Sequence, residues 1–263
     1  MTERRPPTTG LREYATELNN VGLAGLAHKV TKRVGGTFEE RLKAIKELGL
    51  PVEPSISVTM KDFDDNPEKY FDELVERLDG YCPKTYYAAL IAGRVRAMGA
   101  SREELIDFIR DNRQNFPDDY SFSLKSNDHA FSGCLDTDKD GILSGTFVLG
   151  PYHRLTTGES VGDLRITENK FGSGTPELAF TGGMGGGNPG DYRNDNTKYK
   201  TYTGSTITKM QMAEKVLVAR DLLKQAIGVE RGRYIPNMHC RVVFVDSEYG
   251  YKPYFIKAVQ SDI

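Results

Sequence analysis

The stretch CRVVFVDSEYGYKPYFIKAV, residues 240–259, contains two apolar runs that flank a polar turn. Both runs, 240–245 and 253–259, are rich in Val, Phe, Tyr and Ile, which are residues that favour strands. Two such runs joined by a short polar segment predict a β-hairpin. The runs are almost continuously apolar, which is typical of strands that are buried on both faces. We therefore expect this hairpin at the centre of a sheet.

One helix and several short strands precede the hairpin. Ser205 is a typical capping residue, and the apolar positions that follow it recur at helical spacing over 206–227. Strand-like alternation is found further upstream, at 120–125, on both sides of DTDKDG between 130 and 149, at 164–167 and at 178–180. Residues 118–263 are therefore predicted to form a mainly antiparallel β-rich region with one late helix, 206–227, and a Gly-rich loop, 181–205.

The N-terminal half carries helical signals instead. Residues 1–10 contain a Pro-Pro pair and are expected to form a flexible arm, and helical spacing of apolar residues then predominates over 11–117. Asn66 and Pro67 combine an N-cap with a proline at the first helical position. Ser101 and Glu104 have the spacing of a capping box.

A further helix is predicted over 83–98, with Tyr86 and Tyr87 on its inward face, and only 55–60 alternates as a strand in this half. Helices that follow one another at short intervals should pack as a small bundle. The predicted fold class is α+β, in which an N-terminal helical bundle-like region, 11–117, precedes the antiparallel β region.

Charge and cysteine content narrow the class of protein. The 263 residues include 35 Lys and Arg against 37 Asp and Glu, so nucleic acid is not an expected partner and no membrane is either. The N-terminal segment has no apolar core, so no signal peptide and no membrane span is expected there. The three cysteines, Cys82, Cys134 and Cys240, are widely spaced and odd in number, which predicts free thiols in a reducing compartment. These features indicate a soluble cytoplasmic protein, with a chloroplast-stromal or a viral protein as the alternatives.

The segment TGGMGGGNPGDYRNDNTKYKTYTGS, residues 181–205, has a glycine content that predicts a long irregular loop. Long loops in folded proteins are usually functional or disordered. Glycines in 182–190 could let backbone N–H groups hold a phosphate, but no helix begins directly after them. A flexible connection that contacts partners is therefore favoured. The partner contacts are predicted to come from Tyr192, Arg193, Tyr199 and Tyr202.

Asp136, Asp138 and Asp140 occupy positions one, three and five of a calcium-loop pattern in DTDKDG. Alternating carboxylates suit Ca²⁺ because they offer hard oxygen ligands from one turn. Position twelve is Phe147, however, where such a loop needs Glu, and Asp-Gly is also a common signal for a hairpin turn. A hairpin tip is the favoured interpretation, and a Ca²⁺ site is the alternative.

The order of a late helix, a strand, a turn and a second strand ending KPYFIKAV resembles the last sheet segment of the ATP-grasp ligases. The resemblance implies that Lys125, in FSLKS, takes the place of a nucleotide-contacting lysine. In that family the final strand carries metal-binding acidic and amide residues, whereas this chain has Lys257, Ala258 and Val259. On these residues the chain is not identified as a member of the family.

Two interpretations of the function follow. The favoured one is a non-enzymatic assembly or interaction protein, which binds protein subunits (its own or others) through the arm and the 181–205 loop. The alternative is a nucleotide-dependent small-molecule enzyme with this loop as an active-site lid. In the alternative, phosphate would be contacted by Lys125, Arg154, Arg193 and Lys257, and the Mg²⁺ of an Mg-nucleotide would be held by Asp246 or Glu248.

Overall fold

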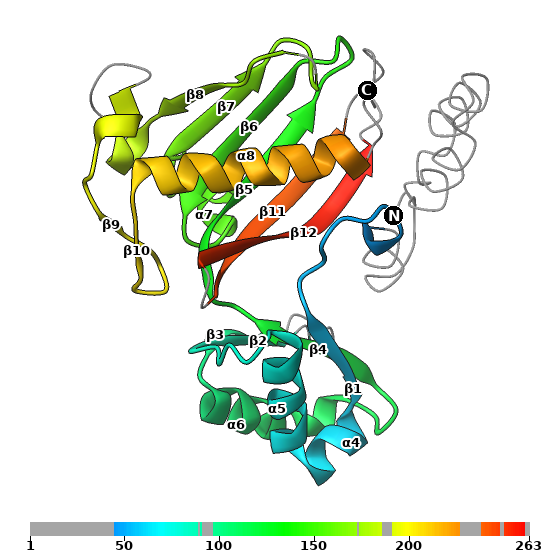
Figure 1. The fold of residues 1–263 in the computed structure, drawn as a ribbon. Coiled ribbons are helices and arrows are strands. Elements are labelled where there is room, and N and C mark those ends of the chain that lie inside the picture. The colour runs from blue at the N-terminus through cyan, green and yellow to red at the C-terminus, as the bar shows by residue number, and fades with distance from the viewer. Residues whose placement is uncertain are drawn as a thin grey trace, which may run out of the picture.

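The structure is a computed structural model that describes residues 45–88, 90, 97–172, 174–185, 191–226, 238–247 and 250–260. The predicted arm, 1–10, and the helical signals between 11 and 44 lie outside the described residues. The described chain contains two main antiparallel sheets, each with helices packed on one of its faces (Figure 1). The expected α+β class is therefore confirmed.

The smaller sheet, at the bottom of Figure 1, has the strand order β1-β4-β2-β3. Its strands are β1 (Ser55–Thr59), β2 (Tyr86–Ala88), β3 (Ala97–Ala100) and β4 (Ser121–Ser126). Its helices are α4 (Met60–Asp65), α5 (Pro67–Arg77), α6 (Arg102–Asp111) and the short 3-10 helix η1 (Arg113–Asn115). We call residues 55–126 the small unit. Strand β4 follows the predicted boundary at residue 117, and it pairs with β1 and β2 inside this unit.

Helix caps in the small unit lie where the sequence predicts them. The Ser101 hydroxyl accepts the N–H of Glu104 at 3.2 Å, and the Glu104 carboxylate accepts the N–H of Ser101 at 2.8 Å. This confirms the capping box at the start of α6. The side chain of Asn66 accepts the N–H of Lys69, and Pro67 is the first residue of α5. Each cap stabilises its helix by about 1 kcal/mol, so local contacts determine where both helices begin.

The helix predicted over 83–98 is wrong, because β2 and β3 occupy the described part of this segment. Tyr86 and Ala88 are buried, whereas Tyr87 between them is half-buried, and this is the two-residue period of a strand. The ring of Tyr86 packs edge-on against Phe71 of α5, with 4.8 Å between ring centroids. Packing against α5 therefore outweighed the helical apolar spacing that the sequence shows over 83–98. The predicted N-terminal helical bundle is therefore not formed by the described residues.

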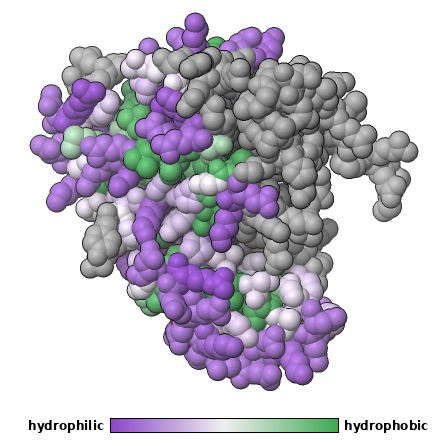
Figure 2. All heavy atoms as spheres, turned by 45° about the vertical axis from the view of Figure 1, so that its right-hand side comes forward, coloured by the Kyte–Doolittle hydropathy of each residue, from purple (hydrophilic) through white to green (hydrophobic). Residues whose placement is uncertain are grey.

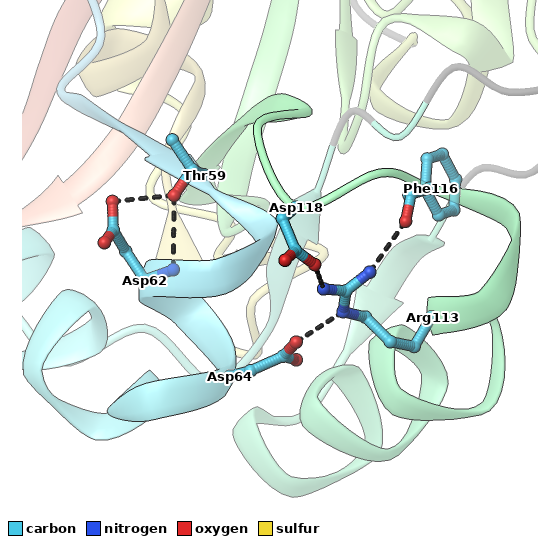
Figure 3. A network of polar contacts seen from close by, with 6 residues as sticks. All are labelled: Thr59, Asp62, Asp64, Arg113, Phe116 and Asp118. Atoms are coloured by element: carbon cyan, nitrogen blue, oxygen red, sulfur yellow. Dashed lines mark hydrogen bonds and ion pairs between the residues drawn. The ribbon is translucent and has the colours of Figure 1, made fainter.

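One arginine connects the turn after α6 to helix α4 (Figure 3). Arg113 forms ion pairs with Asp64 and Asp118, and its Nη1–H donates to the carbonyl of Phe116 at 2.6 Å. Figure 2 shows the small unit, at the bottom of the view, covered mainly by hydrophilic side chains. Because exposed ion pairs each contribute only about 0–1 kcal/mol, this network orients the turn more than it stabilises the unit.

The larger sheet has six strands in the order β12-β11-β5-β6-β7-β8, and neighbouring strands are antiparallel. The strands are β5 (His129–Thr137), β6 (Leu143–Leu149), β7 (Leu164–Glu168), β8 (Glu177–Phe180), β11 (Met238–Ser247) and β12 (Gly250–Gln260). Helix α8 (Lys209–Ala226) crosses one face of this sheet (Figure 1). Its buried side chains Met212, Val216, Ala219 and Leu223 belong to the same core as the sheet. The C-terminal hairpin is thus confirmed, and so is a late helix. This helix begins at Lys209, however, because Thr206 and Ile207 form β10, and the predicted cap at Ser205 is wrong: Thr208 accepts the N–H of Gln211 at 3.2 Å instead.

The two strands of the hairpin differ in their position in the sheet. Strand β11 lies between β12 and β5, and its side chains Val242, Val243 and Phe244 are fully buried, as expected for a central strand. Among the described residues, the only β pairing of β12 besides that with β11 is an isolated bridge from Val52 to Phe255. The expected central position is therefore wrong for β12. The larger sheet and α8 share one hydrophobic core, which we call the α8 core. Phe255 of β12 is buried in it, which accounts for the apolar residues of this strand.

Side chains that point away from α8 form the second face of the larger sheet, which we call the open face. Because strand side chains alternate, positions 134 and 136 of β5 and 239 and 241 of β11 lie on this face. These residues, Cys134, Asp136, His239 and Arg241, are half-buried, whereas Leu135 belongs to the α8 core. The open face is thus the polar face of the sheet in this region.

The 181–205 loop is more regular than its glycine content predicts. Its short elements are η2 (Gly182–Met184), η3 (Asp191–Asn194) and β9 (Tyr199–Lys200), and β9 pairs with β10 (Thr206–Ile207). Met184 is fully buried in the α8 core, and Asp195 forms a 2.8 Å ion pair with Lys209 of α8. These tertiary contacts offset the entropy that glycine-rich backbone loses on ordering. Residues 186–190 lie outside the described residues.

Within the described part of the chain, no helix combines the length and the apolar character that crossing a bilayer would require.

Replacing Gly145 of β6 by alanine should lower the free energy of unfolding by about 1–3 kcal/mol, because the added methyl group overpacks the sheet. A Cβ at this position would lie 2.6 Å from the carbonyl oxygen of Cys134 and 2.7 Å from Ile166 Cγ2. The matched control is Gly183→Ala, where the nearest atom to the new Cβ is 3.8 Å away. Urea denaturation of both variants measures the effect, and equal losses would contradict this account of the packing.

Candidate functional site

The chain passes from the small unit to the larger sheet through two residues, Asn127 and Asp128, between β4 and β5. Asp128 is buried and accepts hydrogen bonds from the Tyr81 hydroxyl at 2.9 Å and from the N–H groups of Lys84 and Thr85 at 2.6 and 3.0 Å. Burial, and after it the charge of Asp128, raises the pKa of Tyr81, which keeps this hydroxyl a donor. The connection between the two sheets is therefore held by a fully engaged carboxylate.

A buried charge cluster lies beside this connection. Glu53, 3 % exposed, accepts from Lys125 Nζ of β4 at 3.2 Å and lies 2.7 Å from Nε2 of His129, the first residue of β5. Burial would raise the pKa of Glu53, but the charges of Lys125 and His129 and their hydrogen bonds outweigh it and lower this pKa to about 2. The ammonium of Lys125 also lies over the ring of Tyr87, 5.1 Å from its centroid. We call Glu53, Lys125 and His129 the hinge cluster.

The end of the 181–205 loop is attached to both units near the hinge cluster. Lys84 of the small unit donates to the carbonyl of Thr203 at 3.0 Å. The hydroxyls of Thr203 and Ser205 donate to the carboxylate of Asp246 in β11. The Tyr251 hydroxyl donates to the carbonyl of Thr206 at 3.0 Å. The segment that joins the Gly-rich stretch to α8 is thus bound to the hairpin on one side and to the small unit on the other.

A second polar cluster lies on the open face, where β5 and β11 pair. His239 is directly opposite Asp136, and its Nδ1 lies 2.6 Å from Asp136 Oδ1; Arg241 is directly opposite Cys134. The guanidinium of Arg241 lies 4.4 Å from the ring centroid of Tyr152, and its Nε is 3.4 Å from His239 Nε2. Burial, together with the charge of Asp136, raises the pKa of Cys134 to about 12, so the thiol is protonated near neutral pH. We call Cys134, Asp136 and His239 the open-face cluster.

The predicted phosphate contacts are dispersed in the structure. Lys125 belongs to the hinge cluster, whereas Arg154 donates to the carbonyl of Leu149 and lies 3.6 Å from Glu159. Arg193 is exposed in η3. The backbone of Lys257 in β12 pairs with Arg241. Of the two predicted Mg²⁺ ligands, Asp246 accepts the loop hydroxyls and Glu248 lies outside the described residues.

The residues predicted to bind a partner make contacts within the chain. Tyr192 packs against Phe180 with 5.5 Å between ring centroids. The ammonium of Lys209 lies over the ring of Tyr199, 5.9 Å from its centroid. Tyr202 is 59 % exposed. A partner contact through these tyrosines and Arg193 stays a prediction.

The DTDKDG segment forms the hairpin turn between β5 and β6. Asp138 Oδ1 accepts the N–H groups of Asp140 and Ile142, each at 2.9 Å, and so closes the turn. Asp136 instead faces His239 on the open face. Among the described residues, the one group of three potential ligands within 4.8 Å of one another is Cys134, Asp136 and His239. The conformation therefore does not gather the three carboxylates that were predicted to bind Ca²⁺.

Sequence reasoning missed Glu53, Asp128, His129 and Arg241 as members of these clusters. Glu53 is 72 residues from Lys125 and 76 from His129 along the chain, so their spacing in the sequence carries no signal. The one available signal was Glu53, the only charged residue in the segment 48–54 that precedes the predicted strand, since carboxylates are rarely buried without a partner.

Comparisons with protein-family models and with curated proteins find no match. Solved structures do match over nearly the whole chain. A D-alanine-D-alanine ligase from Coxiella burnetii is 9 % identical with a TM-score of 0.37, and the match covers 96 % of this chain and 56 % of the ligase. A phosphoribosylglycinamide synthetase from Anaerococcus prevotii is 11 % identical with a TM-score of 0.41, with 97 % and 49 % covered.

A third match is N5-carboxyaminoimidazole synthetase from Staphylococcus aureus complexed with ADP, which is 10 % identical with a TM-score of 0.40 over 95 % of this chain and 51 % of the synthetase. The chain spans about half the length of the structures it matches. These proteins are enzymes, which contradicts the expected non-enzymatic assembly protein and the expected role in protein–protein interaction. That interpretation is therefore corrected.

Proposed function

We propose that this chain is a nucleotide-dependent enzyme that acts on a small molecule, with the nucleotide bound beside the hinge cluster. The observation that carries the proposal is the position of Lys125. Its side chain is 14 % exposed, and its ammonium is oriented by a buried carboxylate at the connection of the two sheets. A lysine fixed in this way is a point charge that suits a phosphate group.

The 181–205 loop supports this assignment, because its end is bound to both units. The Lys84–Thr203 hydrogen bond attaches the loop to the small unit, and Lys252 of β12 forms an ion pair with Asp79 of the small unit. Closing the two units on a ligand would change these contacts. The loop is therefore suited to cover a ligand at the hinge and to exclude water from it.

The residues of the hairpin do not provide the magnesium ligands that the ATP-grasp resemblance implies. Strand β12 contains no Asp or Glu in its sequence. Both carboxylate oxygens of Asp246 accept hydrogen bonds from the loop hydroxyls. We therefore assign no step of the reaction to a metal at this hairpin. We also propose a cytoplasmic location, which the three free cysteines support.

Thermal-shift titration with ATP, GTP and Mg²⁺ tests the proposal, because a ligand that binds the native state must raise the melting temperature. We expect millimolar nucleotide to stabilise the wild-type chain. Lys125→Met should weaken the affinity by a factor of roughly 10–100, since a hydrogen bond to a charged group contributes about 1.5–3 kcal/mol. Lys61→Met, which removes an exposed lysine of α4, is the matched control. A wild-type melting temperature that no nucleotide shifts would overturn the assignment.

A further inference from the structure

The open-face cluster brings three different donor types together at one point of the sheet. The thiol of Cys134, the carboxylate of Asp136 and an imidazole nitrogen of His239 offer ligand atoms that all lie within 4.8 Å of one another. Two adjacent strands fix these side chains, because His239 is the direct cross-strand partner of Asp136, and Cys134 is two residues before Asp136 on the same face. Their positions therefore depend on the sheet and not on a mobile loop.

The donor set matches one class of cation. Sulfur and imidazole nitrogen are preferred by Zn²⁺ and similar divalent transition metals, whereas Ca²⁺ and Mg²⁺ prefer oxygen alone. Zinc–ligand bonds of about 2.0–2.3 Å place tetrahedral ligand atoms about 3.3–3.8 Å apart, so shifts of about 1 Å would complete the site. Binding would release the thiol proton of Cys134 to solvent, and the resulting thiolate and the carboxylate of Asp136 would balance the two positive charges of such an ion.

We infer that Cys134, Asp136 and His239 form a binding site for a divalent transition metal of the zinc class, with three protein ligands and one position left for water or a substrate group. Three protein ligands and an open position are the arrangement of catalytic zinc sites. The site lies on the face of the sheet that α8 does not cover, and all three ligands are half-buried, so an ion can reach them. It differs from the predicted Ca²⁺ site, because only Asp136 is common to both.

Arg241 lowers the affinity of this site for a metal ion. With Nδ1–H of His239 directed at Asp136, Nε2 is the acceptor that faces Arg241 Nε at 3.4 Å. A metal on Nδ1 requires the ring proton to reside on Nε2, where it would meet the N–H of Arg241. Stacking on Tyr152 holds the guanidinium in this place. Arg241 therefore opposes metal binding through both its charge and its N–H group, and its removal should tighten the site.

Cobalt(II) is the probe of choice, because a thiolate ligand produces a charge-transfer band in the near ultraviolet. The full chain, prepared without metal, is titrated with Co²⁺ and the bound cobalt is then displaced with Zn²⁺. We expect the band in the wild-type protein, and Cys134→Ser should abolish it and weaken binding at least tenfold. The matched control is Cys82→Ser, which removes an exposed cysteine and should leave the band unchanged.

Arg241→Gln provides the second variant, since Gln removes the charge and can accept the Nε2–H of His239. We expect it to tighten cobalt binding by a factor of roughly 3–10. Circular dichroism of each variant checks that the sheet is folded. The inference is overturned if the folded wild-type protein and the Arg241→Gln variant both lack the band at millimolar Co²⁺. It is also overturned if Cys82→Ser abolishes the band and Cys134→Ser keeps it. Nucleotide binding at the hinge cluster is measured with Mg²⁺ but without any transition metal, so each of the two proposals can be overturned while the other stands.

Discussion

Replacing Arg220 by methionine should lower the free energy of unfolding by about 3–5 kcal/mol, the cost of leaving one member of a buried ion pair without its partner. Arg220 of α8 donates from Nε to Glu168 Oε2 of β7 at 2.9 Å and from Nη2 to Glu168 Oε1. Glu168 is 1 % exposed, and it also accepts the N–H of Gly172 at 2.8 Å. The pair connects α8 to the sheet, so its loss should affect the whole larger unit. Urea denaturation measures this change.

Two controls separate the buried charge from simple truncation. The double variant Arg220→Met, Glu168→Leu removes both charges and should recover most of the loss, because buried ion pairs and apolar substitutes are often similar in stability. Arg110→Met removes a surface arginine, 61 % exposed and 4.0 Å from Asp107, and should cost less than about 1 kcal/mol. A double variant as unstable as Arg220→Met would show that packing, not charge, determines the effect.

The second large effect is the dependence of stability on acid pH that Glu53 should produce. Its pKa is lowered from 4.5 to about 2 in the folded chain, so the unfolded chain binds the proton first as the pH falls. The stabilisation is complete above pH 4.5 and is lost as the pH falls from 4.5 through about 2. The shift corresponds to a free energy of unfolding on the order of 3 kcal/mol. Melting temperatures between pH 2 and 7 measure it.

Glu53→Gln should remove this part of the acid dependence. It should also destabilise the chain near neutral pH, because Lys125 and His129 lose the carboxylate that they share. Glu73→Gln, which breaks an exposed pair with Arg77 on α5, is the matched control and should keep the wild-type acid profile. The same acid profile in the Glu53→Gln variant and the wild type would rule out Glu53 as its source. Reduced nucleotide affinity in this variant would connect the stability of the hinge cluster with the proposed function.

Features that depend on neighbours in the sequence could be predicted. The caps at Asn66 and Ser101 were found because each satisfies backbone groups three residues away. The hairpin turn at 136–141 and the late helix followed from turn chemistry and from apolar period. The position of Tyr86 could not be predicted in this way, because packing against Phe71 of α5 outweighed the helical apolar spacing over 83–98.

The sequence by itself determined the α+β class, the C-terminal hairpin, most of the helix α8 and the caps at Asn66 and Ser101, because each of these depends on contacts within a few residues. Only the tertiary structure decided that Glu53 meets Lys125 and His129, and that Asp136 meets His239 103 residues away. Strand pairing sets such contacts, and a register shift of one residue would turn each of these side chains to the other face. The candidate sites therefore depend on the register of β4, β5 and β11, which is fixed by the burial of their apolar faces.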